Sequence, residues 1–365
     1  MNLGERLAAL GARFTTGQKV AAGAVALVVV AGGTVGGLVA TSGSSHHAAA
    51  PTPLPSTTAT PKPTPKPTPK PKPKPPPVNP LTGVGPVPKG PVVAVKIDDV
   101  AAARPQVGID KANIVYIEEV EGGLTRLVAV FGTQKPTVGP VRSVRASDPE
   151  LLTQYGRIAF AASGGGGDSL PKLDASILKG DISDRGGPGF SRDGSREVPH
   201  NLMLNLAQIP SSFAAGAKPI GWTWAAHSSL AGAKPGTSLQ TVVGGTGVRF
   251  QWNAGLKRYV RMIDGVTQHA ADGAPVATPN VIVQFCQGYV NPADIDPAGN
   301  PGHYTKSVGR GKVAVFRNGK RIDGTWTRPS PASGTVLRDG KGKVIPLAPG
   351  GAWVVLASTG APLTN

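Results

Sequence analysis

The chain has 365 residues, a formal net charge of +17 and one cysteine. A single cysteine excludes a disulfide framework and a cysteine-based zinc site, and the apolar run around Cys286 is typical of a buried strand. Aromatic residues make up 5% of the chain and show no stacking pattern among the basic residues, so no nucleic-acid partner is expected. Frequent glycine (50) and proline (37) favour turns over long helices.

The N-terminal part predicts a membrane anchor. Residues 20–40 carry no charge, and as a helix they span about 31 Å, enough to cross a bilayer core. The charges just before this run are mostly basic, whereas the first lysine after it is Lys62, so residues 1–19 are expected in the cytoplasm and the rest outside. The alternative is a cleaved signal peptide ending at residues 48–50. Pro51 and the length of the apolar run favour an uncleaved transmembrane helix.

Residues 41–90 are expected to form a disordered linker rich in proline and lysine. Within residues 61–77 nearly every second residue is proline, which prevents helix and sheet and favours extended polyproline II. The folded part is then predicted as a mixed α/β (α+β) N-terminal domain at 91–215, a connecting segment at 216–240 and a smaller, mainly β C-terminal domain at 241–365.

The N-terminal domain opens with a strand at 92–97 that ends at Asp98 and Asp99. Two further strands, at 113–121 and 124–131, are separated by two glycines, the pair that a two-residue type I′ turn requires. This turn would place Glu119 opposite Arg126 as a cross-strand ion pair.

Short helices and loops follow. Ser147 or Asp148 is expected to cap a helix, with Glu150 closing a capping box and Gly156 ending it. A strand at 157–162 then runs into four glycines, before a helix that begins at Asp168. The polar segment 192–201 is expected to be a loop.

The second domain is predicted to be mostly strands, with a hairpin turn at Asn318-Gly319. Residues 301–345 contain ten lysine or arginine residues and two aspartates. Charged and apolar residues alternate along residues 312–321, which predicts a strand with one basic face. This face either binds an anionic wall polymer or is only exposed to solvent. The expected strands are 247–252, 257–262, 280–286, 312–317, 320–326 and 352–357.

Six short motifs together resemble the YerB-like family of bacterial envelope proteins, whose N- and C-terminal parts are domains of unknown function. They are NPLTG at 79–83, ARPQ at 103–106, IVY at 114–116, GLTR at 123–126, GPVRS at 139–143 and PHN at 199–201. The resemblance runs from residue 79 to the C-terminus and implies an exported location. Members often look like lipoproteins, whereas this chain has no cysteine near its N-terminus, so a helix is expected to replace the lipid. The family implies no activity.

Glu118 is the most suggestive acid, because strand alternation places it on the same face as the apolar Ile114 and Tyr116. It is either a general acid or base in a cleft, with Glu121 or Asp98 as the second carboxylate of a glycan hydrolase, or one half of a buried ion pair.

Two further groups are candidates for binding. Arg142 and Arg145 precede the helix at 148, so they form either an anion subsite or ordinary ion pairs. His200, whose backbone is stiffened by the preceding Pro199, either shuttles a proton or binds sugar hydroxyls, or it is only a hydrogen-bonding group of the loop. Residues 294–299 resemble a calcium loop but lack two ligands, so a turn is the better interpretation.

The sequence therefore favours a membrane-anchored, extracytoplasmic protein that binds an anionic or glycan ligand of the cell envelope, with a glycan or peptidoglycan hydrolase as the alternative. Its partners would be a wall polymer or glycan, and the cytoplasmic membrane through the N-terminal helix. No cofactor and no metal are expected, and whether the protein is an enzyme stays open. The candidate catalytic residues are Glu118, Glu121 and His200, and the candidate ligand-binding residues are Asp98, Arg104, Arg126, Arg142, Arg145, Arg192, Asp193, Arg196 and Asn201.

Overall fold

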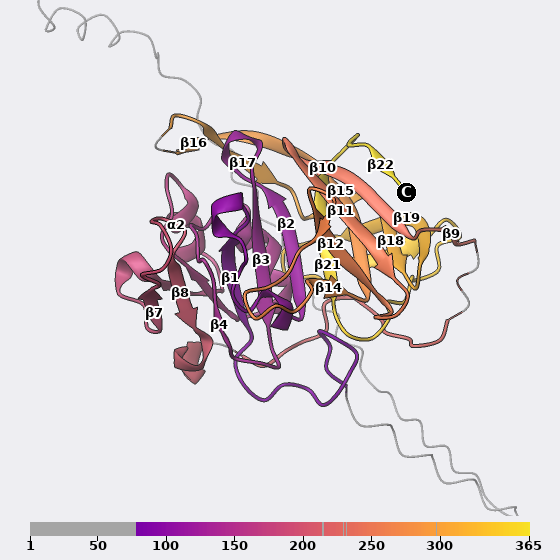
Figure 1. Ribbon diagram of the computed structural model, residues 1–365, viewed down its shortest axis with the longest axis horizontal. Helices are drawn as coiled ribbons and strands as arrows, with labels where there is room; N and C mark the ends of the chain where they lie inside the picture. Colours follow the sequence, from indigo (N-terminus) through magenta and orange to yellow (C-terminus); the bar gives the residue numbers. More distant parts are fainter. Residues whose placement is uncertain (1–77, 214, 229, 231, 297) are drawn as a thin grey trace, which may run out of the picture. The chain divides into compact units, whose positions relative to one another are not determined.

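The computed structural model describes residues 78–365 except 214, 229, 231 and 297 (Figure 1). The predicted cytoplasmic segment, the predicted transmembrane helix and most of the predicted linker lie outside these residues. Within the described part, no helix is both long enough and apolar enough to cross a membrane. The predicted start of the folded part at residue 91 is too late, since Asn79 and Leu81 are fully buried.

An 11-stranded sheet forms the centre of the molecule and contains strands from both halves of the chain (Figure 1). β21 lies between β15 and β2, so the two predicted domains share one sheet. In spatial order the strands are β20 (Val336–Asp339), β19 (Lys320–Arg328), β18 (Gly309–Arg317), β15 (Asn280–Cys286), β21 (Ala352–Ser358), β2 (Ile114–Glu119), β3 (Thr125–Phe131), β1 (Val93–Asp98), β5 (Ala159–Ala162) and β6 (Lys179–Ile182), with β9 (Lys234–Pro235) paired to β19.

Seven strands of this sheet run in the same direction, and one of them is β19, which is separated from β15 by the antiparallel β18. β1, β5 and β6 pair in parallel, as do β2, β21 and β15, and β3 runs antiparallel between β1 and β2. The loops that follow β1, β2, β5 and β6 therefore emerge at one edge, which we call the carboxyl edge. In open α/β sheets, ligands bind outside this edge.

Smaller sheets cover one face of the central sheet. On this face, apolar side chains of the central sheet form one hydrophobic core with those of a six-stranded sheet and a three-stranded sheet. These sheets consist of β10 (Ser238–Val243), β11 (Thr246–Asn253), β12 (Arg258–Ile263), β13 (Val266–Thr267), β14 (Ala277–Thr278) and β22 (Leu363–Thr364), and of β4 (Thr137–Val138), β7 (Phe190–Arg192) and β8 (Leu202–Asn205).

The opposite face packs against the two α-helices found within the described residues, α1 (Asp148–Leu152) and α2 (Ser169–Asp174). β16 (Gly288–Ile295) and β17 (Pro301–Thr305) pair only with each other and form an arm. The predicted helix stop is confirmed, because Gly156 has φ +82°. Both predicted caps are wrong: Ser147 makes no capping hydrogen bond, and the Asp148 carboxylate accepts bonds from Lys96 and from the backbone of Arg145. Glu150 does not close a capping box but accepts bonds from Ser307 and Val308.

The two glycines after β2 do not form the expected two-residue turn. Val120 donates a backbone hydrogen bond to Leu124, so three residues, Glu121–Gly123, make the turn. The register consequently pairs Arg126 with Glu118 and not with Glu119. By contrast, the predicted hairpin between β18 and β19 is confirmed, with positive φ at Asn318 and Gly319.

Candidate functional site

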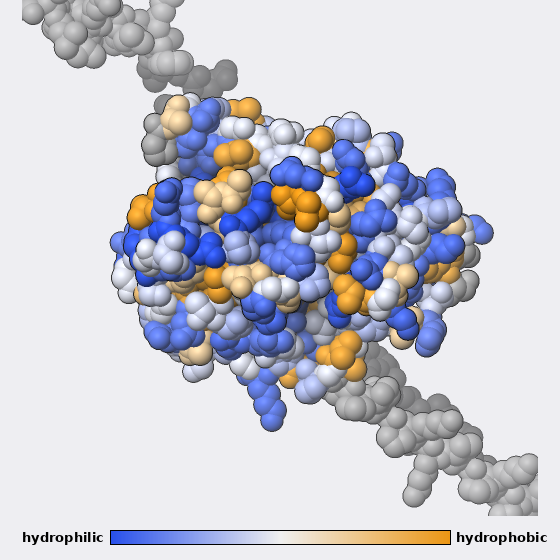
Figure 2. All heavy atoms as spheres, in the orientation of Figure 1, coloured by the Kyte–Doolittle hydropathy of each residue, from blue (hydrophilic) through white to orange (hydrophobic). Residues whose placement is uncertain are grey.

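A cleft of about 730 Å³ opens at the carboxyl edge. Its walls are the carboxyl end of β1, the beginning of β3, the turn after β2, the glycine loop after β5, the loop that carries His200, and the arm. Six of the predicted site residues meet here: Asp98, Glu121, Arg126, Arg142, Arg145 and His200. In the orientation of Figure 1, hydrophilic side chains prevail on the surface (Figure 2).

Asp98 is the last residue of β1 and is 2% exposed. Its Oδ2 lies 2.7 Å from Nδ1 of His200 and 3.2 Å from Nε of Arg142. Its Oδ1 accepts a hydrogen bond from the backbone of Asp99 at 2.9 Å. A rigid strand end therefore orients a histidine 102 residues away in the chain.

Glu121 lies in the turn after β2 and is 4% exposed. It contacts Nε of Arg145, and its Oε2 lies 3.6 Å from Nη2 of Arg126. Burial raises the pKa of Glu121, but Arg145 and Arg126 outweigh this effect and hold the pKa below its ordinary value. Glu121 is therefore ionised at neutral pH.

The arm brings a further carboxylate to the cleft. Asp294 on β16 lies 3.8 Å from Nε of Arg145 and accepts a hydrogen bond from Ser169 at 2.7 Å. Gly167 permits this approach, since a Cβ at that position would lie 1.7 Å from the carbonyl oxygen of Ala293. The cleft is consequently built from both halves of the chain.

Glu118 is not in the cleft, which contradicts the prediction that it supplies acid or base chemistry there. Its side chain is 1% exposed and contacts Nζ of Lys96. Lys96 is fully buried and lies 2.8 Å from Asp148 on the other side. Burial lowers the pKa of Lys96 to about 8, against the attraction of Asp148. Glu118 therefore belongs to a sealed ion cluster beneath the cleft.

The other predicted loop residues do not line the cleft. Arg192 donates to Asn201 at 2.7 Å, Asp193 pairs with Arg196 at 3.2 Å, and Arg196 donates to the carbonyl of Pro105 at 2.7 Å. These contacts hold the loop that carries His200. The remaining predicted residue, Arg104, pairs with Asp99 outside the cleft.

The predicted anion subsite at the start of α1 is not formed. The Asp148 carboxylate, in the first turn of α1, accepts a hydrogen bond from the backbone amide of Arg145 at 2.6 Å, so a negative charge of the chain lies at this end of the helix. The side chains of Arg142 and Arg145 pair with Asp98 and Glu121, two acids that the sequence analysis did not assign to them.

The charged residues of the cleft include more carboxylates than guanidinium groups. They are three arginines (Arg126, Arg142 and Arg145), His200 and five carboxylates (Asp98, Glu121, Asp184, Asp294 and Asp296). Sequence reasoning missed Asp184, which follows β6, and assigned Asp294 and Asp296 to a turn. The sequence signal that could have indicated these acids is the glycine loop after β5, because a run of residues without side chains lets another segment of the chain approach closely. In the described residues no group of three histidine, cysteine or acidic side chains could hold a metal ion.

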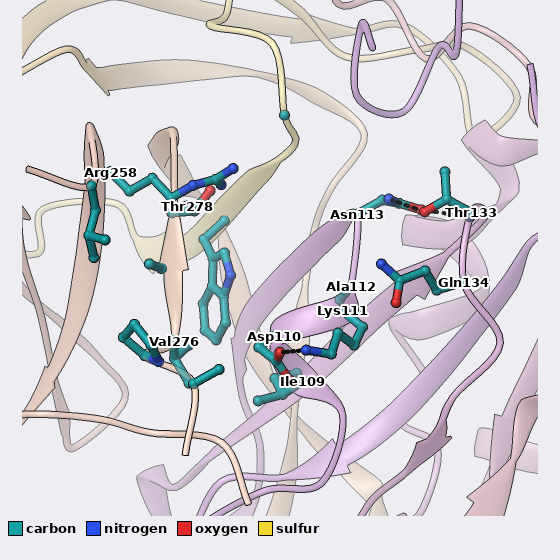
Figure 3. Close-up of a pocket in the computed structure, with 16 residues that line it drawn as sticks. Ile109, Asp110, Lys111, Ala112, Asn113, Thr133, Gln134, Arg258, Val276 and Thr278 are labelled. Carbon is teal, nitrogen blue, oxygen red and sulfur yellow. Dashed lines mark hydrogen bonds and ion pairs between the residues drawn. The ribbon is translucent and has the colours of Figure 1, made fainter. Parts of the chain in front are cut away.

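A second, smaller cavity of about 370 Å³ lies on another part of the surface. Figure 3 shows Asp110, Lys111 and Asn113 on one side of it and Arg258 and Thr278 on the other. Lys111 pairs with Asp110 and with Asp272 at 3.0 Å. None of the predicted site residues lines this cavity, so the cleft at the carboxyl edge is the better candidate.

Comparison with known proteins places the chain in a family. Residues 81–218 match the model "Protein of unknown function (DUF3048) N-terminal domain", and residues 239–354 match the corresponding C-terminal domain. A Bacillus subtilis (strain 168) protein named "Putative lipoprotein YerB" is 29% identical over 279 residues, which cover 72% of this chain and 80% of that protein. The crystal structure of YerB from Bacillus subtilis superposes with a TM-score of 0.67 at 24% identity, covering 79% of this chain and 99% of that one. The chain therefore belongs to the YerB-like family, which these two domains define.

Proposed function

We propose that the protein is a membrane-anchored, extracytoplasmic protein that binds a glycan of the cell envelope in the cleft at the carboxyl edge. The observation that carries this proposal is the convergence of six ion-paired side chains on one cleft that both halves of the chain build. The name of the Bacillus subtilis relative, a lipoprotein, supports an envelope location.

The charges of the cleft favour a glycan over a strongly anionic ligand. Five carboxylates against three arginines would repel a polyanion, whereas paired guanidinium and carboxylate groups offer many donors and acceptors to hydroxyl and amide groups. Leu124 and Ile295, which are 50% and 57% exposed, add apolar surface to the cleft for the carbon faces of a sugar ring.

The predicted basic face along residues 312–321 is smaller than expected. Arg317 is fully buried and donates to the carbonyls of Pro346 and Ala225. Lys312 and Lys320 remain exposed at the two ends. Attraction of these lysines to an anionic wall polymer would be screened by salt, so a salt-sensitive part of wall binding is expected in addition to the cleft.

Co-sedimentation of the full chain in nanodiscs with purified wall glycan tests the proposal. Binding should persist at about 0.5 M salt, where surface attraction is screened. Arg145→Gln should weaken it by about tenfold, the equivalent of 1.4 kcal/mol. The control is Lys341→Gln, which changes one exposed positive charge outside the cleft. Failure of the wild-type chain to sediment, or equal binding by all three proteins, contradicts the proposal.

The location has its own test. Cys286 is 1% exposed, so an impermeant maleimide should not label the wild-type chain. Lys341→Cys introduces an exposed thiol. Labelling of this variant in intact cells supports export, and labelling only after lysis contradicts it. The predicted helix at 20–40 can be tested in the same cells, because its deletion should release the chain from the membrane fraction.

A further inference from the structure

The pair formed by Asp98 and His200 has the geometry of a general base held by a carboxylate. When Nδ1 donates its proton to Asp98 at 2.7 Å, Nε2 carries the lone pair. In the part of the chain that the structure describes, Nε2 makes no hydrogen bond to another residue. His200 lines the cleft with a side chain that is 21% exposed. The basic nitrogen is therefore available to a ligand.

Both members of the pair are fixed in place. Asp98 ends a central strand, accepts a backbone hydrogen bond from Asp99 and pairs with Arg142. His200 donates its backbone N–H to the carbonyl of Glu197 at 2.9 Å. The next residue, Asn201, is held by Arg192. These contacts from several elements fix the position of the imidazole, as is required of a side chain that acts on a ligand.

Guanidinium groups crowd the same cleft. Arg126 is 9% exposed, and among the described residues its guanidinium group has a 3.3 Å bond to the carbonyl of Ser143 and a 3.6 Å contact with Glu121. Burial and then the charge of Arg145 lower the pKa of Arg126 to about 9. A negative charge that forms transiently beside Arg126 would relieve this repulsion, as at an oxyanion site.

The side chains that line the cleft favour one class of hydrolysis over others. Glycoside hydrolysis needs two free carboxylates, but none of the three acids predicted for it is free: Glu118 is sealed, and Asp98 and Glu121 are both paired with arginine. A phosphodiester would bring a full charge among five carboxylates. A carboxylic ester is neutral in the ground state and becomes negative at oxygen only in the transition state. The cleft therefore suits an ester linkage best.

We propose that the cleft hydrolyses an acyl ester on a sugar hydroxyl of the bound glycan, with His200 as the catalytic base and Asp98 as its positioning residue. This inference rests on the proposed function. Nε2 takes a proton from water, whose oxygen bonds to the ester carbonyl carbon while the oxyanion faces Arg126 and Arg142. The bond to the sugar oxygen then breaks, and the imidazolium returns its proton to that oxygen. The products are a carboxylic acid and a free sugar hydroxyl.

The test uses the full chain in nanodiscs and wall glycan fragments whose hydroxyl groups have been acetylated with acetic anhydride. Released acetate is measured by NMR. His200→Gln should lower the rate by about 100-fold or more, the usual contribution of a positioned base. Asp98→Asn should lower kcat with little change in KM, and it should shift the pH–rate profile, which a purely structural role would not do. His269→Gln, an exposed histidine outside the cleft, is the matched control.

Asp98 contacts His200 directly, and the pH–rate profile reports its influence together with that of the other charged groups that line the cleft, which are Glu121, Arg126, Arg142, Arg145, Asp184, Asp294 and Asp296. Binding of unacetylated glycan is measured with the same proteins. Glycan binding by wild type and His200→Gln alike, with acetate released only by wild type, supports the inference. Binding without acetate release, or equal release by His200→Gln and wild type, overturns the inference and leaves the proposed function standing. Absence of binding by all variants contradicts the proposed function itself.

Discussion

Arg261 on β12 donates two hydrogen bonds to the carboxylate of Asp99, at 2.8 Å and 2.7 Å. Both side chains are at most 1% exposed. Asp99 follows β1 in the N-terminal family domain, and Arg261 belongs to the C-terminal one, 162 residues later. This buried pair, together with the shared central sheet, joins the two domains directly behind the cleft residue Asp98.

Arg261→Met is expected to lower the free energy of unfolding by about 3–5 kcal/mol, because it leaves the buried Asp99 carboxylate with the Thr125 hydroxyl at 2.8 Å and, as its charged partner, the more distant Arg104 at 3.6 Å. Urea denaturation measures the change. The double variant Arg261→Met with Asp99→Asn should recover most of the loss, since it removes both charges. A loss below about 1 kcal/mol in the single variant would show that water reaches Asp99.

The same pair predicts a pH dependence. Burial raises the pKa of Asp99, but Arg261 outweighs it and holds the pKa below its ordinary value. A lowered folded-state pKa contributes stability above the unfolded pKa of about 4, and this stability is lost as the pH falls through the folded value. Denaturation midpoints measured between about pH 5 and pH 2 should therefore converge for wild type and Arg261→Met.

Gly167→Ala tests the contact between the glycine loop and the arm. Gly167 has φ +50°, and an added Cβ would collide with the backbone of Ala293, so Asp294 should leave the cleft and glycan affinity should fall by about tenfold. Gly186→Ala is the control, because Gly186 also has positive φ (+74°) but no atom near an added Cβ. Both variants should lose about 1–2 kcal/mol from backbone strain. Equal affinity in the two would contradict a role for the arm.

Asp181→Asn is expected to stabilise the protein at neutral pH. Asp181 on β6 is 1% exposed, neither carboxylate oxygen has a hydrogen-bond partner among the described residues, and burial raises its pKa to about 6. A raised folded-state pKa costs stability as the pH rises from about 4 to 6. The variant should therefore gain about 1–3 kcal/mol at pH 7.5 and nothing at about pH 4. Thermal unfolding at both pH values distinguishes the cost of ionising Asp181 from a change in stability that does not depend on pH.

Glu118→Gln tests whether Glu118 contributes to stability through the sealed ion cluster or to ligand binding in the cleft. Glu118 contacts Lys96, which keeps Asp148 as a second partner, so a loss of about 1–3 kcal/mol in unfolding free energy is expected. Glycan affinity should stay within about twofold of wild type, because Glu118 does not line the cleft. A large loss of affinity at unchanged stability would restore Glu118 as a site residue.

Local signals predicted local structure. The turn at Asn318-Gly319, the helix stop at Gly156 and the buried strand position of Cys286 all depend on residues close in the chain, and all three are confirmed. The two glycines after β2 allowed both a two-residue and a three-residue turn. Packing selected the longer one, since Glu121 is buried against Arg145 in the resulting register.

The sequence by itself determined the family, the buried strands and six residues that meet in the cleft, because these follow from short motifs and alternation. Only the tertiary structure decided which charges face a ligand. Glu118 and Asp98 lie on the two parallel strands that flank β3, and both are in register with Arg126. Yet Glu118 is buried against Lys96, whereas Asp98 contacts His200 in the cleft. Ion pairs between segments far apart in the chain depend on how the sheet brings those segments together, which one-dimensional periodicity does not encode.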